Sequence, residues 1–179
     1  MAQQERFNEL YERHHRAVLG FCLRRTAAPD AYDAAAEVFS VAWRRIDDVP
    51  TGEVERAWLY GVARKALSRQ WRSARRLRKL VNRIGSQPDR VSPDTALLVV
   101  QRAEYARVLE AVSRLSPNDQ EVLRLAAWEG LPHAQISEVL NISVAAVDQR
   151  LHRAKKRLAV LYEGVAPKQP SVAEEGEAS

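Results

Sequence analysis

Helix-breaking residues are few in this chain and fall in a small number of places. Of its 179 residues, seven are glycine and eight are proline. The breaks inside the chain cluster at Pro29, Pro50–Gly52, 84–95, Pro117 and Gly130–Pro132. A β-sandwich or barrel needs frequent turns, whereas long stretches rich in Ala, Leu, Arg and Glu favour helices. We therefore predict an all-α fold.

Apolar residues recur at helical spacing between these breaks. In the second stretch, for example, Ala34, Val38 and Ile46 share one face of a helical wheel. Ser116 and Ser143 stand where helix N-caps are expected. The pattern predicts helices over about 4–26, 29–46, 53–80, 96–114, 117–129, 132–140 and 144–162.

One segment without apolar periodicity divides the chain. Residues 84–95 hold two prolines and a glycine, which is typical of a flexible linker. We expect two small helical domains, at 1–83 and 96–164, on either side of it. Residues 165–179 are acidic and lack large apolar side chains, which predicts a disordered tail.

The second predicted domain ends in a helix-turn-helix pattern. A short helix, a tight turn at Asn141 and a longer helix follow one another over 132–161. One side of the longer helix is apolar, from Val144 to Leu161. The other side, including its flanks, carries Ala145, Asp148, Gln149, Arg150, His152, Arg153, Lys156 and Arg157.

This second side fits a DNA major groove. Gln149 suits adenine and Arg153 suits guanine, while the remaining cations suit phosphates. Asp148 repels phosphate, so it accepts a hydrogen bond from cytosine N4 or else pairs with His152 one turn on. The plain alternative is a helical hairpin with a solvated basic face.

The third predicted helix is strongly basic. From Arg64 to Arg83 the chain has nine Lys or Arg residues and no acid, which is an electrostatic footprint for nucleic acid. A helical wheel places a stripe of cations opposite the apolar face of this helix, and Tyr60 and Trp71 lie beside one edge of the stripe. These cations are Arg64, Lys65, Arg69, Arg72, Arg75 and Arg76. Aromatic rings next to cations favour single-stranded DNA, although a solvated basic helix would look similar.

The second predicted helix presents a mixed polar face opposite its apolar one. This face carries Asp33, Glu37, Ser40 and Arg44. An acidic patch in a chain of net charge +5 favours a basic partner, although an ordinary solvated face is the simpler interpretation.

Other function classes find little support. The single cysteine, Cys22, forms no intrachain disulfide, and no stretch approaches the ~20 apolar residues of a membrane span. His14 and His15 are adjacent and point about 100° apart on a helix, so they do not share a metal easily. We expect a cytoplasmic protein that is not an enzyme and has no catalytic residue, metal, cofactor or membrane insertion.

Four segments resemble the extracytoplasmic-function group of the bacterial sigma-70 family of sigma factors. Residues 31–39 resemble the family's "AEDLVQEVF", and 58–65 resemble "WLYxIARN". Residues 115–123 resemble "LPxxxREVL", and 136–158 are similar to "EIAxxLGISxGTVKSRLxRAxxxL". The similarity covers about 5–162, and the order of the four segments makes it specific.

The resemblance implies a promoter-specificity subunit of RNA polymerase. The polar face with Asp33 and Glu37 would bind the clamp helices of the core polymerase, and the flap of the polymerase is a further expected contact. The basic third helix, with the loop before it, would open and hold the −10 element of promoter DNA, and the last helix would read the −35 element. An anti-sigma factor is a further expected partner.

The chain departs from the family pattern at four places. Ala36 replaces Gln, Lys65 replaces Asn, Ala145–Ala146 replace Gly-Thr, and Asp148 replaces Lys or Arg. These changes leave the promoter sequence open. The main alternative function is a helix-turn-helix repressor or activator that binds palindromic DNA as a dimer without polymerase.

Overall fold

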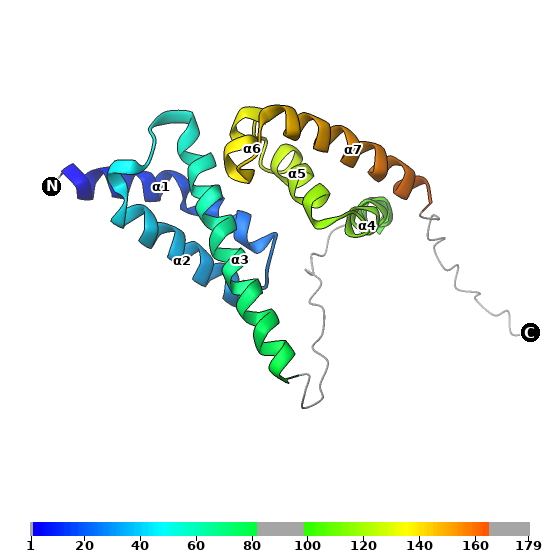
Figure 1. Cartoon of the computed structure of the whole chain (residues 1–179), viewed down its shortest axis with the longest axis horizontal. Helices are drawn as coiled ribbons and strands as arrows, with labels where there is room; N and C mark the ends of the chain where they lie inside the picture. Colours follow the sequence, from blue (N-terminus) through cyan, green and yellow to red (C-terminus); the bar gives the residue numbers. More distant parts are fainter. Residues whose placement is uncertain (1, 82–98, 165–179) are drawn as a thin grey trace, which may run out of the picture.

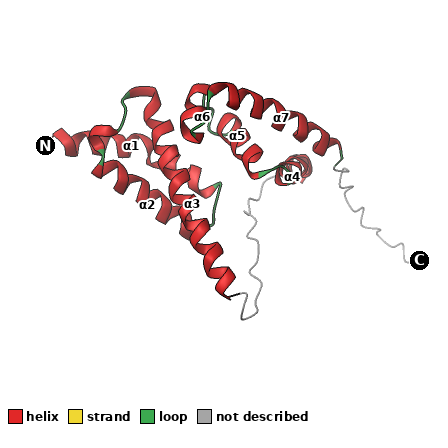
Figure 2. Ribbon diagram, in the orientation of Figure 1, coloured by secondary structure: helices red, strands yellow, loops and turns green. Residues whose placement is uncertain are grey.

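The computed structural model describes residues 2–81 and 99–164 (Figure 1). Throughout these two ranges the chain forms helices and no strand (Figure 2). The predicted all-α fold is therefore confirmed. The predicted linker at 84–95 and the predicted acidic tail at 165–179 lie outside the described residues, so the domain boundaries stay predictions.

The first group of helices begins near the N-terminus. It comprises α1 (Ala2–Leu23), α2 (Ala28–Arg44) and α3 (Glu55–Val81), with short 3-10 helices at Ile46–Asp48 and Gly52–Val54. Pro29 lies in the first turn of α2, where its missing N–H costs no hydrogen bond. Gly52 has a φ of 78°, a left-handed conformation that favours glycine, so the chain turns there before α3.

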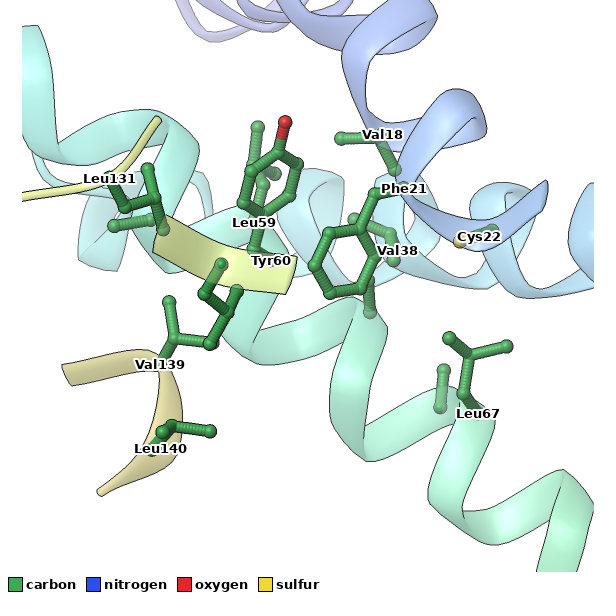
Figure 3. Packing of buried hydrophobic residues seen from close by; sticks show 14 of the residues in the cluster. Val18, Phe21, Cys22, Val38, Leu59, Tyr60, Leu67, Leu131, Val139 and Leu140 are labelled. Carbon is green, nitrogen blue, oxygen red and sulfur yellow. The ribbon is translucent and has the colours of Figure 1, made fainter. Parts of the chain in front are cut away.

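The three helices pack against one another around a common apolar core. Phe21 of α1, Val38 of α2 and Leu59 of α3 have no exposed surface (Figure 3). Burying side chains of this size contributes roughly 1.5–3 kcal/mol each before the entropy of ordering them is subtracted. This packing holds the outward faces of α2 and α3 in a defined relation to each other.

The second group contains the four helices of residues 99–164. These are α4 (Val99–Ser113), α5 (Pro117–Ala127), α6 (His133–Leu140) and α7 (Val144–Glu163). Ser116 caps α5 as predicted, since its hydroxyl oxygen accepts a hydrogen bond from the backbone N–H of Asp119 at 3.2 Å. After α5, Gly130 takes a left-handed φ of 62° and redirects the chain toward α6.

The two groups are in direct contact. Helix α6 packs against α3 (Figure 1). Leu131 and Val139 of the second group belong to the same buried cluster as Leu59 and Tyr60 of the first (Figure 3). The sequence offered no sign of this interface, because it joins segments about eighty residues apart.

Candidate nucleic-acid interface

Helices α6 and α7 form the predicted helix-turn-helix. Asn141 ends α6 in the left-handed conformation, with φ 53° and ψ 52°, which asparagine tolerates better than most residues. The backbone N–H of Ile142 then donates to the carbonyl of Ser137 at 3.1 Å. Ser143 caps α7 through a bond from the Ala146 N–H at 3.2 Å. These local bonds fix the angle at which α7 leaves the turn.

Helix α7 has one buried side and one exposed side. Val147, Leu151 and Ala154 are buried, whereas Val144 is 43% exposed, so the inward side begins one turn later than predicted. The predicted DNA-reading residues lie together on the other side. Its exposed members are Ala145, Asp148, Gln149, His152, Arg153, Lys156 and Arg157, and Arg150 is partly exposed. We call this set the reading face.

Two charges of the reading face have partners within the chain. Asp148 lies 2.5 Å from Nδ1 of His133 at the start of α6, so the alternative pairing with His152 is wrong. The reason is that α6 crosses close to α7 and brings His133 there. Arg157 donates to Oδ2 of the buried Asp119 at 2.7 Å. Arg157 therefore also ties α7 to α5.

The cations of α3 mostly face solvent. Lys65, Arg69, Arg72 and Arg76 are exposed, and Arg64 is partly exposed. Trp71 lies among them with 47% of its surface exposed. The side chain of Arg75 is outside the described set. We call the exposed cations together with Trp71 the basic stripe.

Tyr60 does not belong to this stripe, contrary to prediction. It is 2% exposed, and its ring stacks on Phe21 with centroids 4.4 Å apart. Burial, with Glu129 close by, raises the pKa of Tyr60 to about 12. A helical wheel placed Tyr60 at the stripe's edge, but α1 and the loop after α5 cover that edge. The aromatic side chain available to a base from the described part of α3 is therefore Trp71.

The polar face of α2 adjoins a groove between α1 and α2. Asp33, Ser40 and Arg44 are exposed, and Glu37 is partly exposed and paired with Arg69 of the basic stripe. The groove has a volume of about 930 Å³. Five Phe, Tyr or Trp side chains line it, namely Phe7, Tyr11, Tyr32, Phe39 and Trp43; Asp33, Ser40 and Arg44 also belong to it.

Sequence reasoning missed this groove. Tyr11 of α1 is 43% exposed and Trp43 of α2 is 38% exposed. The rings of Phe7 and Trp43 meet edge-to-face with centroids 5.1 Å apart. The available signal was the excess of aromatic residues on α1 and α2, because a three-helix core of this size does not need them all.

The described residues offer no metal centre and no membrane helix. Among them, no three His, Cys, Asp or Glu side chains gather as a metal site would require. His14 instead contacts Glu55 at 2.9 Å. In residues 2–81 and 99–164, no helix is both long and apolar enough to cross a bilayer.

Comparison with known proteins assigns these two helical groups to one family. The family model for Sigma-70 region 2 matches residues 10–77, and the model for Sigma-70, region 4 matches residues 105–158. The ECF RNA polymerase sigma factor SigL of Mycobacterium tuberculosis is 31% identical over 153 residues, covering 83% of this chain and 84% of SigL. The chain belongs to the extracytoplasmic-function group of sigma factors.

Further relatives agree with this assignment. The RNA polymerase sigma factor CnrH of Cupriavidus metallidurans is 29% identical over 176 residues, which is 92% of this chain and 91% of CnrH. A solved structure from Bartonella quintana contains the sigma factor RpoE with the anti-sigma factor NepR. It superposes on this sigma factor with a TM-score of 0.68 at 18% identity, covering 88% of this chain and 96% of that one. CnrH bound to the cytosolic domain of CnrY gives a TM-score of 0.62 at 24% identity, covering 91% of both chains.

The family assignment settles the type of activity. This sigma factor is a promoter-specificity subunit that binds core RNA polymerase, recognises the −35 and −10 elements and helps to open DNA for transcription initiation. Sigma factors are DNA-binding regulatory subunits. The reading face lies within the region 4 match, whereas the α2 polar face and the basic stripe lie within the region 2 match.

Proposed function

We propose that this sigma factor divides its work among three surfaces. The polar face of α2 and the adjoining groove bind core polymerase, the basic stripe of α3 holds opened DNA at the −10 element, and the reading face of α7 reads the −35 element. The observation that carries this proposal is the exposure of all three surfaces on different helices of the same chain.

The groove between α1 and α2 suits the clamp helices of the polymerase. Its aromatic lining offers apolar area to a helix, and Asp33 and Arg44 supply charges beside it. Charges at the rim of an interface set orientation and association rate more than affinity. We assign Asp33, Glu37, Ser40 and Arg44 to this contact.

The basic stripe suits an unpaired DNA strand. Its cations can follow the phosphates, and Trp71 can stack on an unstacked base. Stacking on an aromatic ring is worth about 1–3 kcal/mol per base, which offsets part of the cost of unstacking it. Tyr60 takes no part while it is buried against Phe21.

The reading face suits the major groove of the −35 duplex. Gln149 and Arg153 project from the second and third turns of α7, where a recognition helix meets base edges. Lys156 and Arg150 would contact phosphates. His133 holds the carboxylate of Asp148 in place. Because this carboxylate accepts hydrogen bonds and repels phosphate, it would favour the N4 amino group of cytosine.

The partners follow from these surfaces and from the relatives. Core polymerase is contacted at its clamp helices and its flap. An anti-sigma factor is a further partner, because RpoE was solved with the anti-sigma factor NepR bound. CnrH was likewise solved with a protein partner, the cytosolic domain of CnrY. The sigma factor acts in the cytoplasm with the polymerase, and it contributes binding rather than a catalytic group of its own.

Run-off transcription tests the proposal. Purified sigma factor, sigma-free core polymerase and fragmented genomic template from the source organism are incubated with nucleotides, and the start sites are mapped. Discrete start sites that depend on the sigma factor are expected, and sequences upstream of them define the two elements. Absence of binding to core polymerase would contradict the proposal and favour a dimeric helix-turn-helix regulator instead.

A further inference from the structure

A buried ion-pair network joins the two helical groups. Arg25, just after α1, donates from Nη1 to Oε1 of Glu129 at 3.1 Å and from Nε to Oε2 of Glu121 at 3.1 Å. Arg24 donates from Nη2 to Oε2 of Glu129 at 2.7 Å. The side chains of Arg25 and Glu129 are 1% and 2% exposed. More than ninety residues of sequence separate the partners.

Apolar and polar contacts surround this network. The guanidinium of Arg25 lies 3.5 Å from the ring centroid of Phe21, an arrangement that attracts the cation to the ring. Leu131, Val139 and Leu140 belong to the same buried cluster as Phe21 (Figure 3). On α6, the side-chain amide of Gln135 donates to the carbonyl of Glu53 at 3.2 Å.

This closed arrangement is too short to read a promoter. The positions that name the −10 and −35 elements place them about 25 base pairs apart. At about 3.4 Å per base pair, this is about 85 Å of B-DNA. From the contact between Gln135 and Glu53, the basic stripe extends at most about 35 Å along α3 to Arg76. Helix α6 adds at most about 12 Å, and the reading face about 20 Å along α7 to Lys156. Even laid end to end, these lengths do not span the two elements.

We propose that the contact of Arg25 with Glu129 and Glu121 is a latch that keeps the two DNA-binding domains of the free sigma factor together, and that it must open before both promoter elements are engaged. The surface of the first domain around Arg25 thus has the chain's own second domain as its partner. This inference rests on the proposed function for its consequence in transcription, but the latch itself can be tested without DNA or polymerase.

The composition of the interface suits a contact that opens. The Nη2 atom of Arg25 and the Oε1 atom of Gln135 are buried without a hydrogen-bond partner. Burying charged groups also carries a desolvation cost that their mutual attraction only partly offsets. When the domains separate, water solvates all of these groups. The closed form is therefore favoured by less than its buried apolar area alone would indicate, and a binding partner can overcome it.

Single substitutions in the latch should open the free chain. Glu129→Gln leaves Arg25 without its most buried partner, and Arg25→Gln leaves Glu129 short of one cation, so both variants destabilise the closed form. Small-angle X-ray scattering of the full-length wild type should give a compact particle, and each single variant should give a larger radius of gyration. The double variant buries neither charge of the pair. Its radius of gyration should therefore increase by less than the sum of the increases in the two single variants. Glu110→Gln removes the exposed ion pair between Glu110 of α4 and Arg114 just after it; this variant is the matched control and should scatter like wild type.

Transcription provides the second measurement. If the closed form is favoured about tenfold, its opening raises the concentration of competent sigma factor up to about tenfold. At limiting sigma factor, Glu129→Gln should then give several-fold more run-off transcript than wild type or Glu110→Gln. If no protein gives transcript, the proposed function fails while the scattering result still decides the latch.

Two scattering outcomes would overturn the latch. The first is an extended wild type, and the second is a Glu129→Gln variant as compact as wild type while its circular dichroism shows retained helices. If Glu129→Gln loses its helices, Glu121→Gln decides instead, because this side chain is more exposed. An unchanged radius there would equally contradict the latch.

Discussion

Arg69 of α3 forms an ion pair with Glu37 of α2. This pair joins the surface that we assign to opened DNA with the surface that we assign to core polymerase. Both side chains keep substantial exposure, at 56% and 35%, so the pair contributes little to stability. The pair matters because it lies where the two surfaces meet. DNA that binds Arg69 would change the charge that Glu37 presents to the polymerase, and polymerase that binds Glu37 would change the charge that Arg69 presents to DNA.

The polar face of α2 can be tested by charge reversal. Asp33→Arg with Glu37→Arg should weaken binding to core polymerase by about tenfold, or about 1.4 kcal/mol, because the partner surface is expected to be basic. Glu12→Arg, an exposed acid on α1, is the matched control. Fluorescence anisotropy of labelled sigma factor gives the affinity, and circular dichroism checks the fold. Equal affinity for all three proteins would remove the clamp assignment.

The basic stripe predicts a separation between strand opening and duplex binding. Arg72→Ala should reduce permanganate reactivity of thymines in the opened −10 region while leaving affinity for a −35 duplex nearly unchanged. Arg72 is preferable to Arg69, because Arg69→Ala also frees Glu37. Trp71→Ala should act in the same direction by about 1–3 kcal/mol if a base stacks on the ring. A parallel loss in both assays would show that Arg72 supplies only general charge.

The reading face predicts a base-specific role for Arg153. Arg153→Ala should lower discrimination at one −35 position by about 1–3 kcal/mol. Lys155→Ala removes one charge from the same helix at an exposed site and should instead weaken all sequences alike. Binding to a set of single-base −35 variants at fixed salt separates these results. If both variants lose affinity uniformly, Arg153 is a phosphate contact.

Glu55 predicts an acid-sensitive component of stability. Burial opposes the charge of Glu55, but hydrogen bonds from His14 and Arg13 outweigh it and hold the pKa of this carboxyl below its usual value. A lowered folded-state pKa stabilises the fold above the unfolded value of about 4.3, and this stabilisation is lost as pH falls through the folded value.

Urea unfolding between pH 3 and 7 measures this effect. The wild type should lose stability on acidification more steeply than Glu55→Gln, which has no carboxylate to protonate at this position. Glu110→Gln should keep the wild-type slope. Identical slopes for wild type and Glu55→Gln would show that Glu55 titrates as it does in the unfolded chain.

Cys22 should be chemically inert in the folded protein. It is fully buried, and burial raises the pKa of its thiol to about 11 although Arg25 and Arg24 lie near. Little thiolate is therefore present at neutral pH, and the thiolate is the reactive form. Reaction with a disulfide reagent at pH 7.5 should be slow in buffer and fast in denaturing urea. Rapid reaction of the folded protein would contradict this and reveal an exposed thiol.

Much of the local structure was decided by the sequence itself. The cap at Ser116, the left-handed turn at Asn141 and the cap at Ser143 all stand where predicted. Each depends on bonds between residues a few positions apart, so the neighbours along the chain are sufficient to determine it. The exposed sides of α3 and α7 were predictable for a related reason, because helical periodicity alone separates their two faces.

Contacts between helices were decided only by the tertiary structure. Tyr60 is buried, Asp148 pairs with His133, and Arg25 meets Glu129 after a separation of 104 residues. A helical wheel gives the direction of a side chain within its own helix, but it contains no information about which other helix covers that direction. Burial and long-range ion pairs depend on how whole helices pack, and in this sigma factor that packing brings its two DNA-binding domains together.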